Sequence, residues 1–217
     1  MADFPTVIPI FPLPNLVLFP GVSVPLHIFE PRYRQMIADI EQSQGIVGMT
    51  LLKGDWERDY HANPDIFVIG CAGKVNELVK LPDGRFNLVL QGLSEFTIAR
   101  EIRSRSYRQA EVRWCPVDHR ELELDAESFE GLKQLLFDYL GNAGPEAWRL
   151  MIERQGLRDI GLVNFLCFHL DITPLEKQTL LEARGGRLDC LFDILTFRLE
   201  ERKAGLPGSG GGSGSAQ

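Results

Sequence analysis

The stretch FPLPNLVLFPGVSVPLHIFEPRYRQMI, residues 11–37, decides the fold of the first half of this chain. Five prolines and a Pro-Gly pair divide it into short runs of Val, Leu and Phe, a composition typical of β-strands. From Pro31 onward the apolar residues recur at intervals of three and four, the period of one helix face, at Tyr33, Met36, Ile37 and Ile40. Two short strands and one inserted helix are therefore predicted, with the prolines at strand starts and sheet edges.

The same apolar stretch is not expected to be a targeting signal. It lacks the basic segment that begins a secretory signal, and its prolines would break the helical apolar core of one. No run of about 18 apolar residues follows that could span a membrane. The cysteines form no C-x-x-C pair and lie among apolar neighbours, so free thiols are expected at Cys71, Cys115, Cys167 and Cys190. We expect a soluble, cytoplasmic protein.

The remainder of residues 1–117 also predicts β-structure. Apolar or alternating runs are separated by Gly- and Pro-containing segments, and they occupy residues 45–52, 66–81, 85–101 and 107–117. A hairpin turn is expected at Pro82-Asp83-Gly84, and a bulge or a close backbone approach at Gly70 and Gly73. Residues 53–65 are expected to be a polar loop. The pattern predicts a small barrel or a strongly bent sheet.

Helical spacing dominates the second half of the chain. Residues 118–204 predict a helical bundle as a second domain. Residues 144–156 are expected to form one helix, and the nearly all-round apolarity of residues 159–170 predicts a buried central helix. A capping box, formed by Thr173 with Glu176, is expected to begin another helix. The Gly- and Ser-rich residues 205–217 are expected to be a disordered tail.

The sequence contains no motif that fixes a cofactor, a metal or a catalytic group. The nearest approach to a phosphate-binding loop, residues 68–75, has Val68 and Val75 where a glycine and a hydroxyl residue are required. GLSEF, residues 92–96, lacks the second glycine of a nucleophile elbow. No metal-binding His motif occurs, so neither a metal nor a cofactor is expected. A hydrolase whose catalytic residues meet only in space stays an alternative, which Ser- and Cys-reactive probes would test.

Three stretches, in this order, resemble the N-terminal substrate-binding domain of Lon proteases. The pattern P-L-x-x-x-V-x-F-P-G…P-L is carried by Pro12, Leu13, Val17, Phe19, Pro20, Gly21, Pro25 and Leu26. The following G-x-V…hairpin…V-x-G-L stretch is carried by Gly73, Val75, Pro82, Gly84, Val89, Gly92 and Leu93. The E-K-Q-x-L-L-E segment is carried by Glu176, Lys177, Gln178, Leu180, Leu181 and Glu182. Together the three stretches cover about residues 7–203.

The resemblance implies an α+β fold, with a PUA-like β domain in residues 1–117 and a helical bundle in residues 118–204. Lon proteases continue into an ATPase module and a Ser-Lys peptidase, whereas this chain ends in its Gly/Ser-rich tail where those parts would begin. A stand-alone, non-catalytic member is therefore expected. The resemblance implies recognition of exposed hydrophobic or unfolded polypeptide segments, in protein quality control or proteolysis, with an ATP-dependent protease as a candidate partner.

Aromatic side chains are the candidate anchors for such a polypeptide, because a few buried aromatic contacts supply most of the affinity of an interface. Trp56 and Tyr60 lie in the polar loop, which gives little reason to bury them. Phe11, Phe19 and Phe29 could line an apolar groove, although a place in the core is the alternative for all three. Exposed sheet edges would add main-chain hydrogen bonds.

One basic cluster supports an alternative function, an RNA-binding PUA-like module. It consists of Arg100, Arg103, Arg105, Arg108 and Arg113, with Tyr107 among them. Glu101 and Glu111 interrupt the cluster, and the formal net charge of the chain is -7. Proteins that bind nucleic acids are usually basic, whereas this chain is acidic. We therefore favour a solvated hairpin over RNA binding as the interpretation of the arginine cluster.

Overall fold

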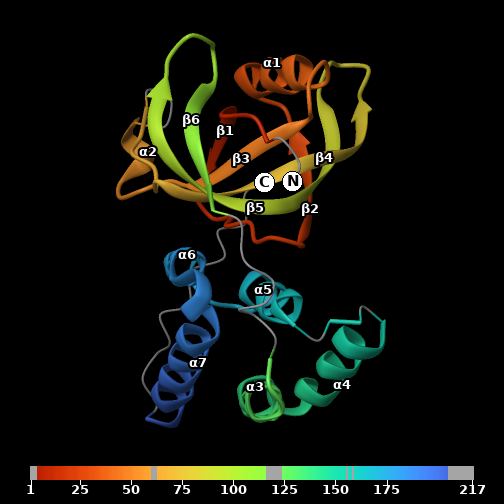
Figure 1. Cartoon of the computed structure of the whole chain (residues 1–217), viewed down its shortest axis with the longest axis vertical. Helices are drawn as coiled ribbons and strands as arrows, with labels where there is room; N and C mark the ends of the chain where they lie inside the picture. Colours follow the sequence, from red (N-terminus) through yellow and green to blue (C-terminus); the bar gives the residue numbers. More distant parts are fainter. Residues whose placement is uncertain (1–3, 60–62, 116–123, 155, 158, 205–217) are drawn as a thin grey trace. The chain divides into compact units, whose positions relative to one another are not determined.

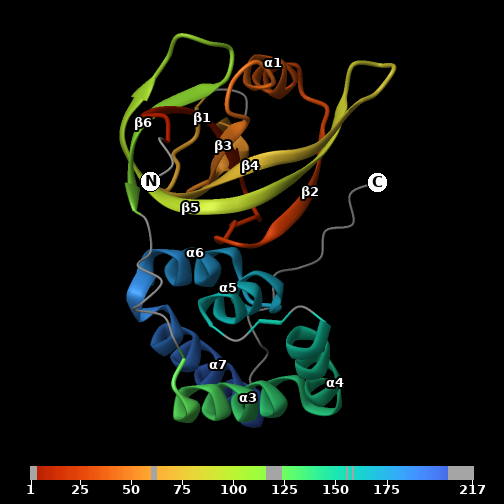
Figure 2. The ribbon, with the colours of Figure 1, turned by 45° about the vertical axis from the view of Figure 1, so that its right-hand side comes forward.

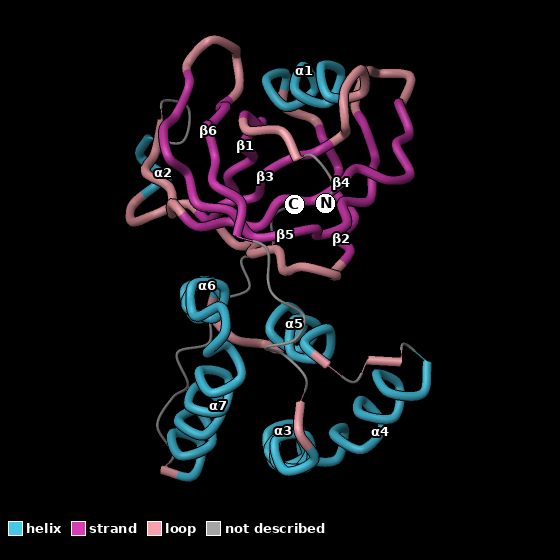
Figure 3. Tube along the Cα trace, in the orientation of Figure 1, coloured by secondary structure: helices cyan, strands magenta, loops and turns pink. Residues whose placement is uncertain are grey.

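The chain folds as two compact units, residues 1–117 and residues 118–217 (Figure 1). The structure, a computed structural model, describes residues 4–59, 63–115, 124–154, 156–157 and 159–204. Among these residues, Figure 3 shows every strand in the first unit and only helices and loops in the second. This is the α+β class that the sequence predicted.

The described part of the first unit contains six strands and two helices. In chain order they are β1 (Val7–Leu13), β2 (Ser23–Ile28), α1 (Pro31–Ile40), β3 (Ile46–Leu51), α2 (Trp56–Asp59), β4 (Ile69–Lys80), β5 (Phe86–Ile102) and β6 (Arg108–Cys115). The inserted helix α1 buries the four residues predicted to form its apolar face. The short helix α2 lies where a polar loop alone was predicted.

The strands close into a barrel around one long strand. Their order is β2-β5-β4-β3-β1-β6, and an additional pairing of β6 with β5 closes the sheet while β2 stays at an end of the order. Strand β5 changes partner along its length, because residues 86–91 pair with β2 and residues 95–102 pair with β6. Figure 2 shows β5 curving across the unit as this change requires. The predicted hairpin joins β4 to β5.

The opening stretch is fastened to the middle of β5. Its residues Val17, Leu18 and Phe19 are buried, and the chain then turns at Gly21, whose φ of 81° favours glycine. The Gly21 amide donates to the Gly92 carbonyl at 2.9 Å, and the Gly92 amide donates to the Val22 carbonyl at 2.8 Å. The apolarity of this stretch is therefore mostly core.

The sequence predicted that the prolines would lie at strand starts and sheet edges. The prolines of β1 do not lie at a sheet edge, because β1 lies between β3 and β6. Each half of β1, however, pairs on one side. Residues 7–10, which include Pro9, pair with β6, and residues 10–13, which include Pro12, pair with β3. A missing amide hydrogen is tolerated where one side of a strand needs no donor. In contrast, Pro25 lies in β2, at an end of the strand order.

Two glycines of β4 allow close packing, as predicted. The pairing register of β4 with β5 shifts between Ala72 and Gly73, which is a bulge. A Cβ atom at Gly70 would lie 2.3 Å from the Met49 carbonyl oxygen, so a larger residue would force the backbone apart. The core beside them includes the fully buried Phe96.

The described part of the second unit is helical. Its elements are α3 (Ala126–Leu140), η2 (Gly141–Ala143), α4 (Gly144–Arg149), the π-helical η3 (Leu150–Arg154), α5 (Ile160–His169), α6 (Pro174–Ala183), η4 (Arg184–Gly186) and α7 (Arg187–Lys203). The predicted capping box forms at the start of α6, where Thr173 and Glu176 bond to each other's backbone amides. Helix α5 is largely buried, as its all-round apolarity predicted. The predicted tail, residues 205–217, lies outside the described residues.

Candidate functional site

Two of the five predicted anchors lie in the core of the first unit. Phe11 is 6% exposed and packs against the Tyr33 ring of α1, with ring centroids 4.4 Å apart. Phe19 is 0% exposed. Because both rings lie inside the folded unit, neither is part of the surface that a polypeptide meets. Phe11 and Phe19 thus occupy the core, which was the alternative to a place in a binding groove.

The other three predicted anchors differ in exposure. Trp56 is half-buried, because its ring packs against the apolar core of the barrel. Tyr60 lies outside the described residues. Phe29, directly after β2, is 60% exposed, and its ring stacks on that of His27 with centroids 6.2 Å apart. Phe29 is therefore the described aromatic of the five that is most open to a partner.

A shallow hollow lies beside His27. Its volume is about 480 Å³, and it is formed by Pro25, Leu26 and His27 of β2, Glu77 and Val79 of β4, and Asn87, Leu88 and Val89 of β5. Val79 is 54% exposed, and His27 Nδ1 lies 2.6 Å from Asn87 Oδ1. The hollow thus presents apolar side chains next to an end strand of the sheet.

A larger apolar cavity lies inside the second unit, and sequence reasoning did not find it. Its volume is about 590 Å³. The apolar lining consists of Leu140, Ala147, Leu150, Met151, Phe165, Leu166 and Leu170, with Tyr139 beside them. His169, Asp171 and Arg202 complete the lining with polar groups. The composition, mostly apolar with a few polar groups, is that of a ligand pocket.

The π-helical turn explains why the sequence did not predict the cavity. Residues 144–156 have the spacing of one regular helix, but the structure ends α4 at Arg149 and continues with a π-helical segment. A π-turn inserts an extra residue and rotates the following side chains about the helix axis. Leu150 and Met151 of this segment line the cavity. Single π-turns occur often at functional sites, although helical spacing gives no signal of them.

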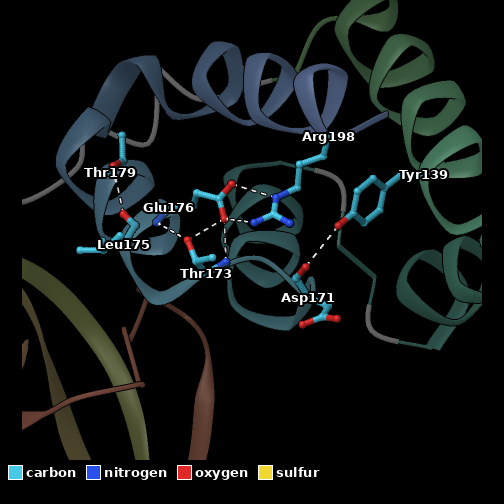
Figure 4. A network of polar contacts seen from close by, with 7 residues as sticks. All are labelled: Tyr139, Asp171, Thr173, Leu175, Glu176, Thr179 and Arg198. Carbon is cyan, nitrogen blue, oxygen red and sulfur yellow. Dashed lines mark hydrogen bonds and ion pairs between the residues drawn. The ribbon is translucent and has the colours of Figure 1, made fainter. Parts of the chain in front are cut away.

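A polar network fixes the chain between α5 and α6, next to the cavity (Figure 4). Glu176 Oε2 accepts from the Thr173 amide at 2.6 Å and from Thr173 Oγ1 at 2.7 Å. Arg198 of α7 donates Nε to Glu176 Oε1 at 2.8 Å and Nη2 to Oε2 at 2.5 Å. The Tyr139 hydroxyl donates to the Asp171 carbonyl at 3.2 Å. These bonds tie the cavity residues Tyr139 and Asp171 to neighbouring helices.

The charges at the cavity follow from these contacts. Burial raises the pKa of Glu176, but the hydrogen bonds from Arg198 and Thr173 outweigh it and leave the pKa below its ordinary value. Burial, and secondarily the charge of Lys177, lowers the pKa of His169, so the imidazole is neutral at pH 7. The Arg202 guanidinium lies over the Tyr139 ring, 4.3 Å from its centroid, and donates to the Tyr139 carbonyl at 2.9 Å. These contacts with Tyr139 hold the Arg202 side chain in place at the lining of the cavity.

Two arginines of the predicted cluster are engaged by neighbouring residues. The side chain of Arg100 is 72% exposed and pairs with Glu111 at 3.1 Å. Arg108 is only 13% exposed and donates to Asn63 Oδ1 and to the Pro64 carbonyl. Nothing in this arrangement favours the RNA-binding alternative.

Other chemistry is not assembled in the described part of the chain. Within it, no group of three or more His, Cys, Asp and Glu side chains is placed to hold a metal ion. The four cysteines are free, with Cys71 and Cys167 buried, and burial raises the pKa of the Cys167 thiol to about 12. No helix of the described residues is long and apolar enough to cross a membrane.

Comparisons with known proteins agree with this fold. The chain is 27% identical over 212 residues to a Lon protease of Flavobacterium johnsoniae, covering 94% of this chain and 25% of that protein. It is 30% identical to Lon protease 2 of Myxococcus xanthus, covering 91% and 24%. The chain thus spans about a quarter of the length of these curated relatives.

Two solved structures share the fold. The N-terminal domain of the Mycobacterium avium complex Lon protease matches with a TM-score of 0.65 at 20% identity. A Lon N-terminal domain protein from Xanthomonas campestris matches with a TM-score of 0.63 at 24% identity. Each match covers 88% of this chain and 98% of the other. A family model also matches residues 7–196, and the chain therefore belongs to the ATP-dependent protease La (LON) substrate-binding domain family.

Proposed function

We propose that this protein binds exposed apolar segments of other polypeptides, and that the cavity of the second unit receives one or more of their side chains. Membership of a substrate-binding domain family supports this class of ligand. The cavity is the observation that carries the proposal, since about 590 Å³ lies within the range of roughly 300–1,000 Å³ typical of ligand pockets. Binding, and not catalysis on the polypeptide, is the proposed activity.

The lining suits an unfolded polypeptide better than a charged small molecule. Leu150, Met151 and Phe165 supply flexible and aromatic apolar surface, which adapts to side chains of different shape. Asp171 is exposed at the cavity and offers a carboxylate to the backbone amides of a bound segment. His169 is neutral at pH 7 and therefore adds no charge that would attract or repel a charged polypeptide segment.

Phe29 and the hollow beside His27 provide a second candidate contact, in the first unit. Phe29 offers an exposed aromatic ring, and β2 offers an end strand of the sheet. A client strand that pairs with a free sheet edge gains main-chain hydrogen bonds without requiring a particular sequence. We propose that this surface adds affinity to the same activity.

The test is a titration of fluorescent apolar peptides and of a reduced, unfolded protein with the wild-type chain. We expect dissociation constants of about 1–100 µM, because a few anchors must offset the ordering of a flexible client. Ala147→Phe places a ring at the cavity and is expected to weaken binding about tenfold. Ala126→Phe, at an exposed position on α3, is the matched control and is expected to bind normally.

Two results are decisive. If no peptide of a varied panel binds the wild-type chain below about 1 mM, the proposed function is wrong. If peptides bind and Ala147→Phe weakens them no more than Ala126→Phe does, the cavity is not the site. Circular dichroism of both variants checks that each keeps its helices.

A further inference from the structure

The hairpin that joins β5 to β6 lies against helix α1 (Figure 1), and residues of both line a polar cavity. This cavity has a volume of about 220 Å³ and lies within the first unit. Its lining includes four arginines, Arg32, Arg103, Arg105 and Arg108, together with Ser106 and Tyr107. The apolar-segment function proposed above uses none of these residues.

Polar contacts with α1 hold the hairpin in place. The Tyr107 hydroxyl donates to Asp39 Oδ2 of α1 at 2.8 Å, and Arg105 Nη1 lies 3.6 Å from the same oxygen. The hydrogen bond from Tyr107, followed by one from Gln35, holds the pKa of Asp39 below its ordinary value. Burial, with Asp39 as a secondary cause, raises the pKa of Tyr107 to about 12. Asp39 is thus ionised and Tyr107 neutral at pH 7, as the hydrogen bond requires.

Arg103, Arg105 and Arg108 have two carboxylate partners between them among the described residues, Asp39 and Glu101. Arg32 pairs with Glu30 at 3.0 Å, and Arg108 lies 3.5 Å from Glu101. Arg105 shares Asp39 with Tyr107. Arg103 is exposed, and it has no ion pair with a carboxylate of the described residues. The cavity therefore keeps a cation that is available to an anion.

Arg108 supplies a second, independent observation. Its Nε and Nη2 donate to Asn63 and Pro64, but its buried Nη1 has no hydrogen-bond partner among the described residues. A buried donor without an acceptor costs about 1–3 kcal/mol, and more when the group is charged. The guanidinium that carries this donor borders the cavity. An anionic acceptor inside the cavity would lower that cost.

We propose that this cavity is a binding site for a small phosphate-bearing molecule, held by Arg103, Arg105 and Arg108. Guanidinium groups match the oxygens of a phosphate in pairs, and several arginines around one site suit a dianion better than a single carboxylate. The Ser106 hydroxyl is a further donor at the lining. The volume of about 220 Å³ suits a phosphate or diphosphate group.

The test uses the full chain and isothermal titration with inorganic phosphate, pyrophosphate and citrate at a constant ionic strength set by chloride. We expect saturable binding of pyrophosphate, with phosphate weaker and citrate weaker still. Arg103→Gln is expected to reduce pyrophosphate affinity about tenfold, because it removes charge-assisted hydrogen bonds from an exposed residue that the fold does not need. Arg100→Gln, on β5 outside the cavity, is the matched control and is expected to bind as the wild type does.

Each contrary result overturns the proposal. No saturation by pyrophosphate up to about 10 mM would show that the cavity is not a site. Equal binding of citrate would show that it selects charge and not phosphate. Equal losses of pyrophosphate affinity in the Arg103→Gln and Arg100→Gln variants would show that the anion binds a diffuse basic surface and not the cavity. A short RNA that binds far more tightly than pyrophosphate, and whose affinity depends on both residues, would lead to the same conclusion.

Discussion

The substitution Glu176→Gln tests whether the network of Figure 4 holds the second unit together. Glu176 accepts from Thr173 at two donors and from Arg198 at two donors. Glutamine keeps one acceptor oxygen for the capping box, but it turns an NH₂ group toward Arg198 and removes the negative charge. The Arg198 side chain is only 9% exposed, so its charge would remain in the interior without this partner.

The expected loss follows from these contacts. Removing one partner of a fully buried ion pair costs about 3–5 kcal/mol. Because the Glu176 side chain is 25% exposed, water relieves part of this cost, and we expect a loss of about 2–4 kcal/mol in the free energy of unfolding. The control Glu130→Gln breaks a pair in which Glu130 is 65% exposed and should cost less than about 0.5 kcal/mol.

Urea unfolding, followed by far-ultraviolet circular dichroism at pH 7, measures both variants. The double variant Glu176→Gln with Arg198→Met should cost less than the sum of the two single changes, since no cation is then left behind. A Glu176→Gln loss below about 1 kcal/mol, or strict additivity in the double variant, would refute this account of the network.

The Glu176–Arg198 pair also makes the free energy of unfolding depend on pH. The lowered pKa of Glu176 means that its contribution is complete above its ordinary value of 4.5 and is lost as pH falls through the lower, folded value. The difference in stability between the wild type and Glu176→Gln should therefore shrink as pH falls below about 4.5, and a difference that stays constant to lower pH would contradict the assignment.

Three further substitutions test other parts of the structure. Phe29→Ser should weaken peptide binding several-fold in the titration above, whereas Phe197→Ser, which changes an equally exposed ring, should not. Gly70→Ala should lower the free energy of unfolding by about 3 kcal/mol, because its Cβ would meet the Met49 carbonyl, and an unchanged urea midpoint would refute this reason. Arg187→Met should lower the free energy of unfolding by about 2–4 kcal/mol, because the guanidinium of this buried side chain donates to two carbonyls and an amide oxygen that would lose their donor. A loss below about 1 kcal/mol would show that these hydrogen bonds contribute little to stability.

Local signals in the sequence predicted most of the elements. The inserted helix followed from Pro31 and the spacing of Tyr33 to Ile40, and the capping box followed from Thr173 and Glu176 alone. These features depend on residues a few positions apart, where periodicity and capping chemistry act. The hairpin at residues 82–84 was equally local.

The exposure of individual aromatics depended on distant parts of the chain. Residues 8–12 of β1 are all buried, so the strand shows no alternation from which the place of Phe11 could be deduced. Phe19 is covered because its turn meets Gly92 of β5. The phosphate site likewise requires Tyr107 to meet Asp39 across 68 positions of sequence. Pairing over such separations leaves no periodic trace.

The most direct test of the proposed function follows one methionine methyl group by NMR during a peptide titration. Met151 lines the cavity of the second unit, whereas Met36 and Met49 are buried in the first unit and serve as internal controls. With ¹³C-methyl methionine, we expect a saturating apolar peptide to shift the Met151 signal along the same isotherm as the fluorescence titration, with Met36 and Met49 unchanged. A peptide that binds by fluorescence while Met151 does not move would contradict the proposal that this cavity receives the client.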